Sequence, residues 1–149
     1  MTFVFTVIVT VMYLLTLAVY QLYGNTEAEL WQRGSWHCTL YDFQAKFSFA
    51  IAKQGQLWRL ITPIFLHNNT VHLFWNVISL FMIGFTVEKM MPSKLKFSLF
   101  IVLGGSAANL LSAVAGRYHI SVGSSGVVFT MLGALVLWFT LNFKAMGGF

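Results

Sequence analysis

The sequence predicts an all-α polytopic membrane protein, and three observations support that fold class. Hydrophobic residues make up 58% of the 149 residues, and the mean hydropathy is +0.75. Charged residues make up only 9%, against about 25% in an ordinary soluble domain. The apolar residues also gather into four stretches, each close to the ~20 residues that a helix needs to cross a bilayer. This composition excludes a soluble globular enzyme and a disordered chain.

The four apolar stretches are predicted to be helices, because backbone groups in lipid must find their hydrogen-bond partners within the segment. The first is interpreted as a signal anchor or true span rather than a cleaved signal peptide, since its apolar core is too long and no basic residue precedes it. Short connections follow the second and third spans, so the last three spans should be antiparallel neighbours. The predicted ranges are about 3–23, 71–87, 97–115 and 122–143.

The segment 24–59, between the first two spans, is too long for a tight connection and should fold on its own. It is rich in aromatic residues, and polar side chains such as Lys46 are interspersed along it. This pattern predicts one short amphipathic helix at the membrane interface, with tryptophans at the level of the lipid headgroups. The apolar residues that recur at helical spacing are Leu40, Phe43, Phe47 and Ala50.

The net charge of +5 comes from basic residues that are scattered along the chain. They form no stripe that would bind a phosphate backbone, so a nucleic-acid partner is not predicted. Lys89, Lys94 and Lys96 lie close together in the connection 88–96, which favours an inside position for this connection and an outside position for the long segment. The single cysteine, Cys38, excludes an intrachain disulfide and has no assigned role.

The third predicted span carries small residues in steps of four, and the fourth span repeats the pattern. One face of each helix is therefore nearly flat, which lets a neighbouring helix approach closely. We interpret both faces as packing surfaces without chemistry. The residues are Gly104, Ala108, Ser112 and Gly116 in the third span, and Gly126, Thr130, Gly133 and Ala134 in the fourth.

Polar residues at membrane depth are costly and are default candidates for function. His72 and Asn76 are four residues apart, so they share one face of a helix. Two side-chain donors on one face can stabilise a developing oxyanion, although a polar contact between helices is the simpler interpretation. His67 precedes this helix and suits a capping or loop-fixing role. Asn109 is a further polar residue, in the third span.

Ser125 lies in the run Gly123-Ser124-Ser125-Gly126 at the start of the fourth span. Glycine on both sides allows a sharp backbone turn, and the first N–H groups of a helix have no intrahelical partner. This arrangement suits a nucleophile whose own N–H helps to hold an oxyanion, while a plain helix start is the alternative. The second and fourth spans should begin at the same membrane face, so Ser125, His72 and Asn76 together are consistent with acyl transfer.

With these residues the sequence resembles the rhomboid intramembrane serine proteases. The third-span pair Gly104-Gly105 and Asn109 also look like those of the family. The resemblance implies a rhomboid-like helical bundle with a six-helix core, of which residues 1–149 would be an incomplete domain with four helices. It rests on Trp58-Arg59, His67-x4-His72-x3-Asn76 and Gly123-x-Ser125-Gly126, in the family's order and on the matching spans.

The resemblance implies a serine endopeptidase that cleaves transmembrane protein substrates in the bilayer, as a multi-pass protein of an unspecified membrane. It implies no metal or cofactor. By position it makes Ser125 the nucleophile, His72 and Asn76 the oxyanion donors, Gly123 and Gly126 the residues of the active-site turn, Trp58 and Arg59 the residues that fix the long loop, and His67 a structural residue.

The chain departs from the family in its general base, which the family takes from a histidine in its sixth span. The histidines present are His37, His67, His72 and His119, and none matches that position. Either the chain is part of a longer protein, or His72 is the base and leaves Asn76 and backbone N–H groups to hold the oxyanion. We favour the first interpretation, and expect the 149-residue chain not to cleave a substrate.

Two other functions are open at this point. A non-catalytic rhomboid-like protein would bind transmembrane clients, but such a protein has no need of Ser125 between intact glycines. A small transporter or channel subunit would need an ion or substrate path. The predicted spans contain no acidic residue and no pair of broken helices that would suggest one.

Overall fold

The computed structural model describes residues 1–23, 36–116 and 119–147. The regular elements in those ranges are helices, and four of them are long and apolar enough to cross a membrane. The predicted all-α polytopic membrane protein is therefore confirmed, with span ends within a few residues of those expected. The spans are Thr2–Leu22, Thr70–Met90, Lys94–Ala115 and Ser125–Asn142.

The first span is helix α1 (Thr2–Tyr23). Its first turn is held by Glu88, whose carboxylate accepts a hydrogen bond from the backbone N–H of Thr2 at 2.7 Å and pairs with the ammonium group of Met1. A carboxylate at a helix N-terminus satisfies an otherwise free N–H and complements the helix dipole. Farther along, the hydroxyl of Tyr13 bonds to that of Thr70 at 2.8 Å, which ties α1 to the second span.

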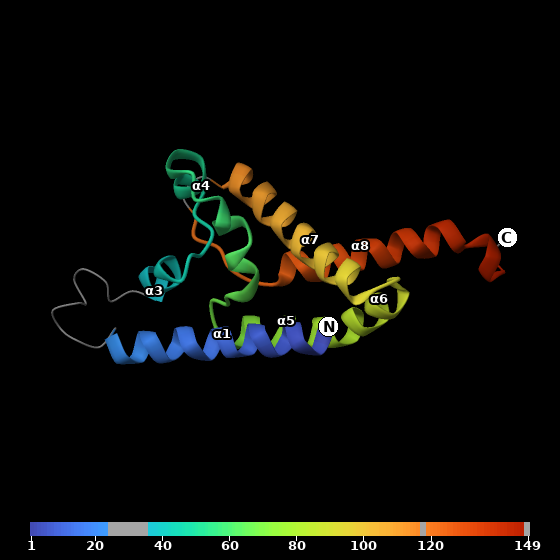
Figure 1. Ribbon diagram of the computed structural model, residues 1–149, viewed down its shortest axis with the longest axis horizontal. Coiled ribbons are helices and arrows are strands. Elements are labelled where there is room, and N and C mark those ends of the chain that lie inside the picture. The colour runs from blue at the N-terminus through green and yellow to red at the C-terminus, as the bar shows by residue number, and fades with distance from the viewer. Residues whose placement is uncertain (24–35, 117–118, 148–149) are drawn as a thin grey trace.

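The second span consists of α5 (Thr70–Ser79), the π-helical turn η3 (Leu80–Gly84) and α6 (Phe85–Met90). It contacts α1 and α8, and in Figure 1 it runs along α1. Gly84 allows the close approach of α1, because a Cβ at Gly84 would lie 2.7 Å from Cγ2 of Thr2.

Helices α7 (Lys94–Ala115) and α8 (Ser125–Asn142) pack through the small-residue faces expected from the sequence. A Cβ at Gly104 would lie 2.3 Å from Cγ2 of Thr130, and a Cβ at Gly126 would lie 2.6 Å from Cβ of Ala108. The interpretation of these faces as packing surfaces is therefore confirmed for the first half of α8. Gly133 differs, because no described atom lies within 4 Å of its Cβ position. The last turns of α8 extend beyond the other described helices in Figure 1.

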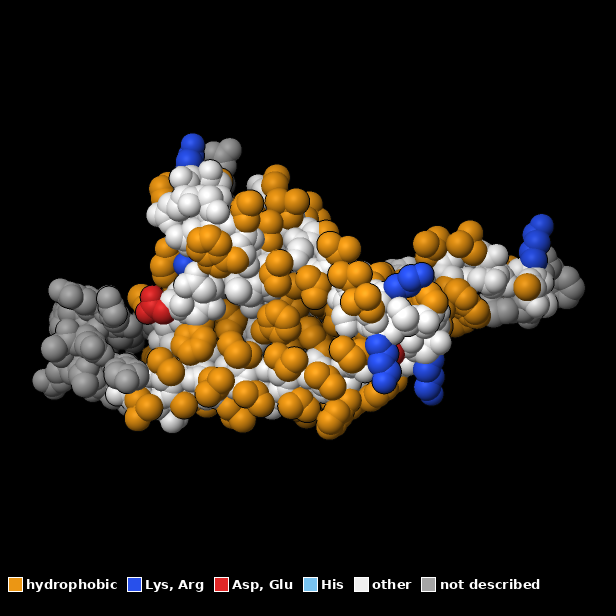
Figure 2. All heavy atoms as spheres, viewed as in Figure 1, with side chains coloured by type: hydrophobic (Ala, Val, Ile, Leu, Met, Phe, Trp, Pro, Cys, Tyr) orange, Lys and Arg blue, Asp and Glu red, His pale blue; other side chains and the backbone are white. Residues whose placement is uncertain are grey.

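The apolar core is built from all four spans. Large apolar side chains on the outer faces remain exposed, as expected for helices whose surroundings are lipid. Apolar side chains cover much of the face that Figure 2 shows. Core residues include Phe5, Val9 and Tyr13 of α1, Leu73 and Leu80 of the second span, Phe97 and Ile101 of α7, and Val127 and Met131 of α8.

The predicted single interfacial helix is wrong. The described part of the long segment forms two short helices, α3 (Trp36–Asp42) and α4 (Ser48–Gln54), and residues 24–35 lie outside the described part. The chain turns between the helices at Gln44, whose φ is +68°. Lys46 then lies in the interior with no exposed surface, so helical periodicity placed it on the wrong side.

Lys46 is buried because the end of α7 offers it acceptors. Its ammonium group donates to the carbonyl and the hydroxyl of Ser112 at 3.3 and 3.1 Å. Ser48 adds a bond from its hydroxyl to the carbonyl of Gly116 at 2.7 Å. The C-terminal end of a helix carries a partial negative charge that attracts cations. Burial lowers the pKa of Lys46 from its ordinary value.

Candidate active site

The chain enters α8 through a turn that is held from two directions. Lys46 and Ser121 exchange two backbone hydrogen bonds of 3.1 Å, which pair the segments in an antiparallel manner. The N–H of Gly123 donates to the carbonyl of Pro63 at 2.9 Å. Gly123 has a φ of +133°, which side chains other than glycine rarely adopt. Ser125 follows as the first residue of α8.

The imidazole of His72 lies directly against Gly123. A Cβ at Gly123 would be 2.6 Å from Cε1 and 3.0 Å from Nε2 of His72, so only glycine leaves room for the ring. His72 is in the first turn of α5, where its backbone N–H donates to the side chain of Asn69 at 2.8 Å. The fold thus brings His72 into contact with Gly123, which is far from it in sequence and lies two positions before Ser125.

Asn76 lies one turn after His72 and is buried in the bundle. Its side-chain amide donates to the carbonyl of His72 at 2.8 Å. An asparagine amide has two N–H donors, so this bond orients the group and leaves one donor for another acceptor.

Ser124 and Ser125 have different environments. Ser124 has no exposed surface, and its backbone N–H donates to Nε2 of His67 at 3.4 Å. Its hydroxyl lies 3.3 Å from the same nitrogen. Ser125 is half-buried. The sequence pattern predicts no role for Ser124, although its place beside Ser125 in a glycine-flanked pair is a visible signal.

His67 joins the turn before α8 to His72. Its ring is buried and meets the ring of His72 edge to face, with centroids 5.2 Å apart. The capping role considered for His67 belongs to Asn69, whose side chain caps α5. Burial, and to a lesser degree the charge of His72, lowers the pKa of His67 to about 4, so the ring is neutral at pH 7.

Acid should destabilise the fold through His67. An unfolded histidine binds a proton near pH 6.5, whereas the buried ring binds one only near pH 4. The unfolded state therefore binds more protons between these values, and stability falls as the pH drops from 6.5 to 4, by roughly 3 kcal/mol in total. Thermal unfolding in detergent across this range should show the loss, and His67→Gln should show a shallower one. An unchanged pH slope in His67→Gln would contradict this origin.

The residues expected to fix the long loop contact it at several points. Arg59, in the short helix η1 (Leu57–Leu60), is almost fully buried. Its guanidinium donates to the carbonyls of Tyr41 and Ala45 at 3.0 and 2.9 Å and lies 4.2 Å above the Tyr41 ring. Trp58 is half-exposed and donates from its indole to Gln44 at 2.8 Å.

A cavity of about 210 Å³ opens next to His72. Its wall comes from α3, from α5 and the segment that precedes it, and from the extended segment that precedes Gly123. The cavity lies beside the turn that leads into α8. The lining residues are His37, Leu40, Asn68, His72, Ile120, Ser121 and Val122.

Asn109 has a structural contact. Its side-chain amide donates to the carbonyl of Leu60 at 2.9 Å and so attaches α7 to η1. Within the described residues, no group of three or more His, Cys, Asp or Glu side chains is arranged to hold a metal ion.

Comparison with known proteins gives one consistent family. The family profile described as "Rhomboid domain" matches residues 54–149. Rhomboid protease GluP of Bacillus subtilis is 42% identical over 98 residues, which are 66% of this chain and 19% of the relative. Rhomboid-like protease 1 of Toxoplasma gondii is 37% identical over 97 residues, 64% of this chain and 33% of that protein.

A plant relative is similar over a comparable stretch. RHOMBOID-like protein 5 of Arabidopsis thaliana is 38% identical over 88 residues, 58% of this chain and 28% of the relative. The matched segment thus spans a third or less of these three relatives' own length. No solved structure matches the chain.

Proposed function

The chain belongs to the rhomboid family, and from that premise we propose that it is an intramembrane serine endopeptidase that cleaves transmembrane protein substrates. At the family level, the protease names of the relatives support intramembrane proteolysis. The observation that carries the proposal is the contact of His72 with Gly123, because it brings a side-chain donor to the turn that leads into Ser125.

In this proposal Ser125 is the nucleophile. Its hydroxyl gives its proton to a general base and attacks the scissile carbonyl, whose oxygen becomes an oxyanion. The peptide C–N bond then breaks, and the amine leaves with that proton. As the first residue of α8, Ser125 has a backbone N–H without an intrahelical partner. The proposed donors to the oxyanion are that N–H, a ring N–H of His72 and the second N–H of Asn76. Such donors commonly contribute 10²–10³-fold each in a site shielded from water.

The glycines and the second serine have supporting roles in the proposal. Gly123 makes room for the His72 ring, and Gly126 allows α8 to lie against Ala108 of α7. Ser124 is held by His67, which fixes the turn. The cavity beside His72 would admit the water that hydrolysis consumes.

We propose that the general base is neither His67 nor His72. His67 is buried, and its Nε2 is already hydrogen-bonded to Ser124. If His72 were the base, one donor to the oxyanion would be lost. The purified 149-residue chain should therefore not cleave a model transmembrane substrate. Clear cleavage by this chain that Ser125→Ala abolishes would overturn this proposal and make His72 the base.

A serine-reactive fluorophosphonate tests the nucleophile. We expect the intact protein, treated in its native membrane, to carry the adduct on Ser125 when its peptides are mapped by mass spectrometry. Ser125→Ala should lose the adduct. Ser124→Ala is the matched control and should keep it, because Ser124 has no exposed surface to react and the backbone N–H of residue 124 can still donate to His67. No adduct on the unmodified protein, or an equal one on Ser125→Ala, would favour the alternative of a non-catalytic protein that binds transmembrane clients.

A further inference from the structure

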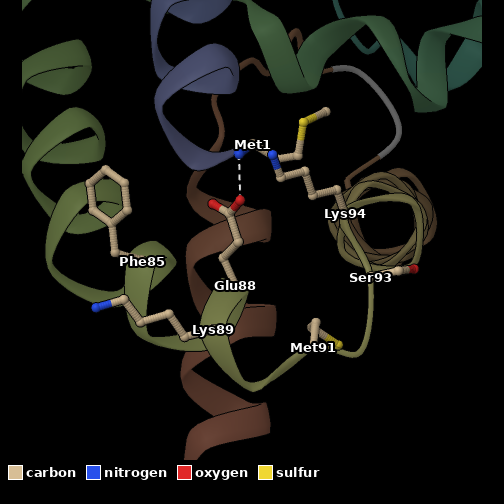
Figure 3. Close-up of a pocket in the computed structure, with 7 residues that line it drawn as sticks. All are labelled: Met1, Phe85, Glu88, Lys89, Met91, Ser93 and Lys94. Atoms are coloured by element: carbon tan, nitrogen blue, oxygen red, sulfur yellow. Dashed lines mark hydrogen bonds and ion pairs between the residues drawn. The ribbon is translucent and has the colours of Figure 1, made fainter.

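A second cavity, of about 400 Å³, lies where α6 connects to α7. Figure 3 shows Glu88 in its wall, with Lys89 and Lys94 on either side of the Glu88 side chain. Glu88 and His72 are in the last and first turns of the same span. At 1.5 Å per residue their backbones are on the order of 24 Å apart, so this cavity is separate from the candidate active site.

The charges around this cavity are not balanced by the residues that the structure describes. The carboxylate of Glu88 is already used by the backbone N–H of Thr2 and the ammonium group of Met1. Lys89 and Lys94 are exposed, and in the described residues no carboxylate pairs with either ammonium group. The cavity wall therefore presents two cations for which the described part of the chain supplies no counterion, and this charge suits an anionic ligand.

The rest of the wall and its surroundings are apolar. Phe85 and Met91 line the cavity, and Phe85, Met90 and Leu95 beside it are exposed large apolar side chains. These residues are at the end of two membrane spans, which is the depth of the lipid headgroups. A ligand here would meet positive charge at one end and a hydrocarbon-facing surface at the other.

We propose that this cavity binds the headgroup phosphate of an anionic phospholipid, with Lys89 and Lys94 as its cationic contacts. A basic pocket between helices at the membrane surface is a known type of site for acidic lipids. The apolar surroundings favour a lipid over free phosphate, because they provide contacts for acyl chains that inorganic phosphate does not have. The site is independent of the proposed protease activity.

Lipid binding can be measured on the purified protein in phosphatidylcholine nanodiscs, with phosphatidylglycerol added in steps and retained lipid counted by native mass spectrometry. Each lysine near an anionic surface is expected to contribute about fivefold in affinity, so Lys89→Gln/Lys94→Gln should bind phosphatidylglycerol about 25-fold more weakly. Both residues are exposed, so the fold should be retained, which the melting temperature in pure phosphatidylcholine will show.

Lys96→Gln is the matched control. Lys96 is exposed at the same end of α7 but does not line the cavity, so Lys96→Gln should weaken binding less than Lys94→Gln does. Equal weakening by Lys96→Gln and by Lys94→Gln would show a general surface-charge effect and overturn the site. If inorganic phosphate and phosphatidylglycerol at matched concentrations raise the melting temperature of the protein equally, the assignment of the site to a lipid is overturned.

Discussion

Replacing Gly123 with alanine should slow the fluorophosphonate reaction of Ser125 in the intact protein by about 100-fold or more. The new Cβ would lie 2.6 Å from Cε1 of His72, too close for the ring to keep its place. Displacing the ring removes one donor from the proposed oxyanion site, and such a loss costs about 10²–10³ in rate. The backbone adds strain of roughly 1–3 kcal/mol, because alanine is held at a φ of +133°.

Gly55→Ala separates the effect of backbone strain from the effect of displacing the His72 ring. Gly55 also has a positive φ, of +68°, but no described atom lies within 4 Å of its Cβ position. This variant should lose some stability through backbone strain and react with the probe at the rate of the unmodified protein. If Gly123→Ala also reacts at that rate, the contact between His72 and Gly123 does not support catalysis.

Gly104→Ala should weaken the packing of α7 against α8 by about 1–3 kcal/mol, the usual cost of overfilling a packed contact. The added Cβ would lie 2.3 Å from Cγ2 and 2.5 Å from Oγ1 of Thr130. The Thr130 hydroxyl is bonded to the carbonyl of Gly126 at 2.8 Å, so it cannot move away without losing that bond. Thermal unfolding in detergent should therefore occur at a lower temperature.

Gly133→Ala, in the small-residue face of α8, is the control. The described residues leave open space around its Cβ position, so alanine should be tolerated and should favour the helix by up to about 1 kcal/mol. If both substitutions lower the unfolding temperature equally, the close contact between the helices at Gly104 is not the cause of the destabilisation.

The membrane spans could be predicted closely because the bilayer imposes a strong local rule. A helix in lipid must be apolar along its length and must satisfy its own backbone hydrogen bonds. Residues 97–115 and 122–143 therefore stand out in the sequence, and the structure has α7 and α8 there. The small-residue faces could also be recognised, since a step of four residues follows directly from the helical repeat.

The long segment could not be predicted as well, because its structure depends on partners that are distant in sequence. Lys46 fits the polar face of an amphipathic helix, but its backbone pairs with Ser121 and its ammonium group with Ser112. The positive φ of Gln44 that turns the chain toward these partners has no sequence signal of its own. Periodicity reports local repeats, and it carries no information on such contacts.

The sequence by itself determined that the chain is a helical membrane protein, and it identified His72, Asn76 and Ser125 as the polar residues whose position in the bilayer requires an explanation. Alternation of the spans predicts that they lie near one membrane face. Only the tertiary structure decided which groups are in contact. The His72 ring packs against Gly123, and Nε2 of His67 accepts a hydrogen bond from the buried Ser124. Those contacts depend on how closely α5, the turn and α8 approach one another, and that is settled by the packing of the whole bundle.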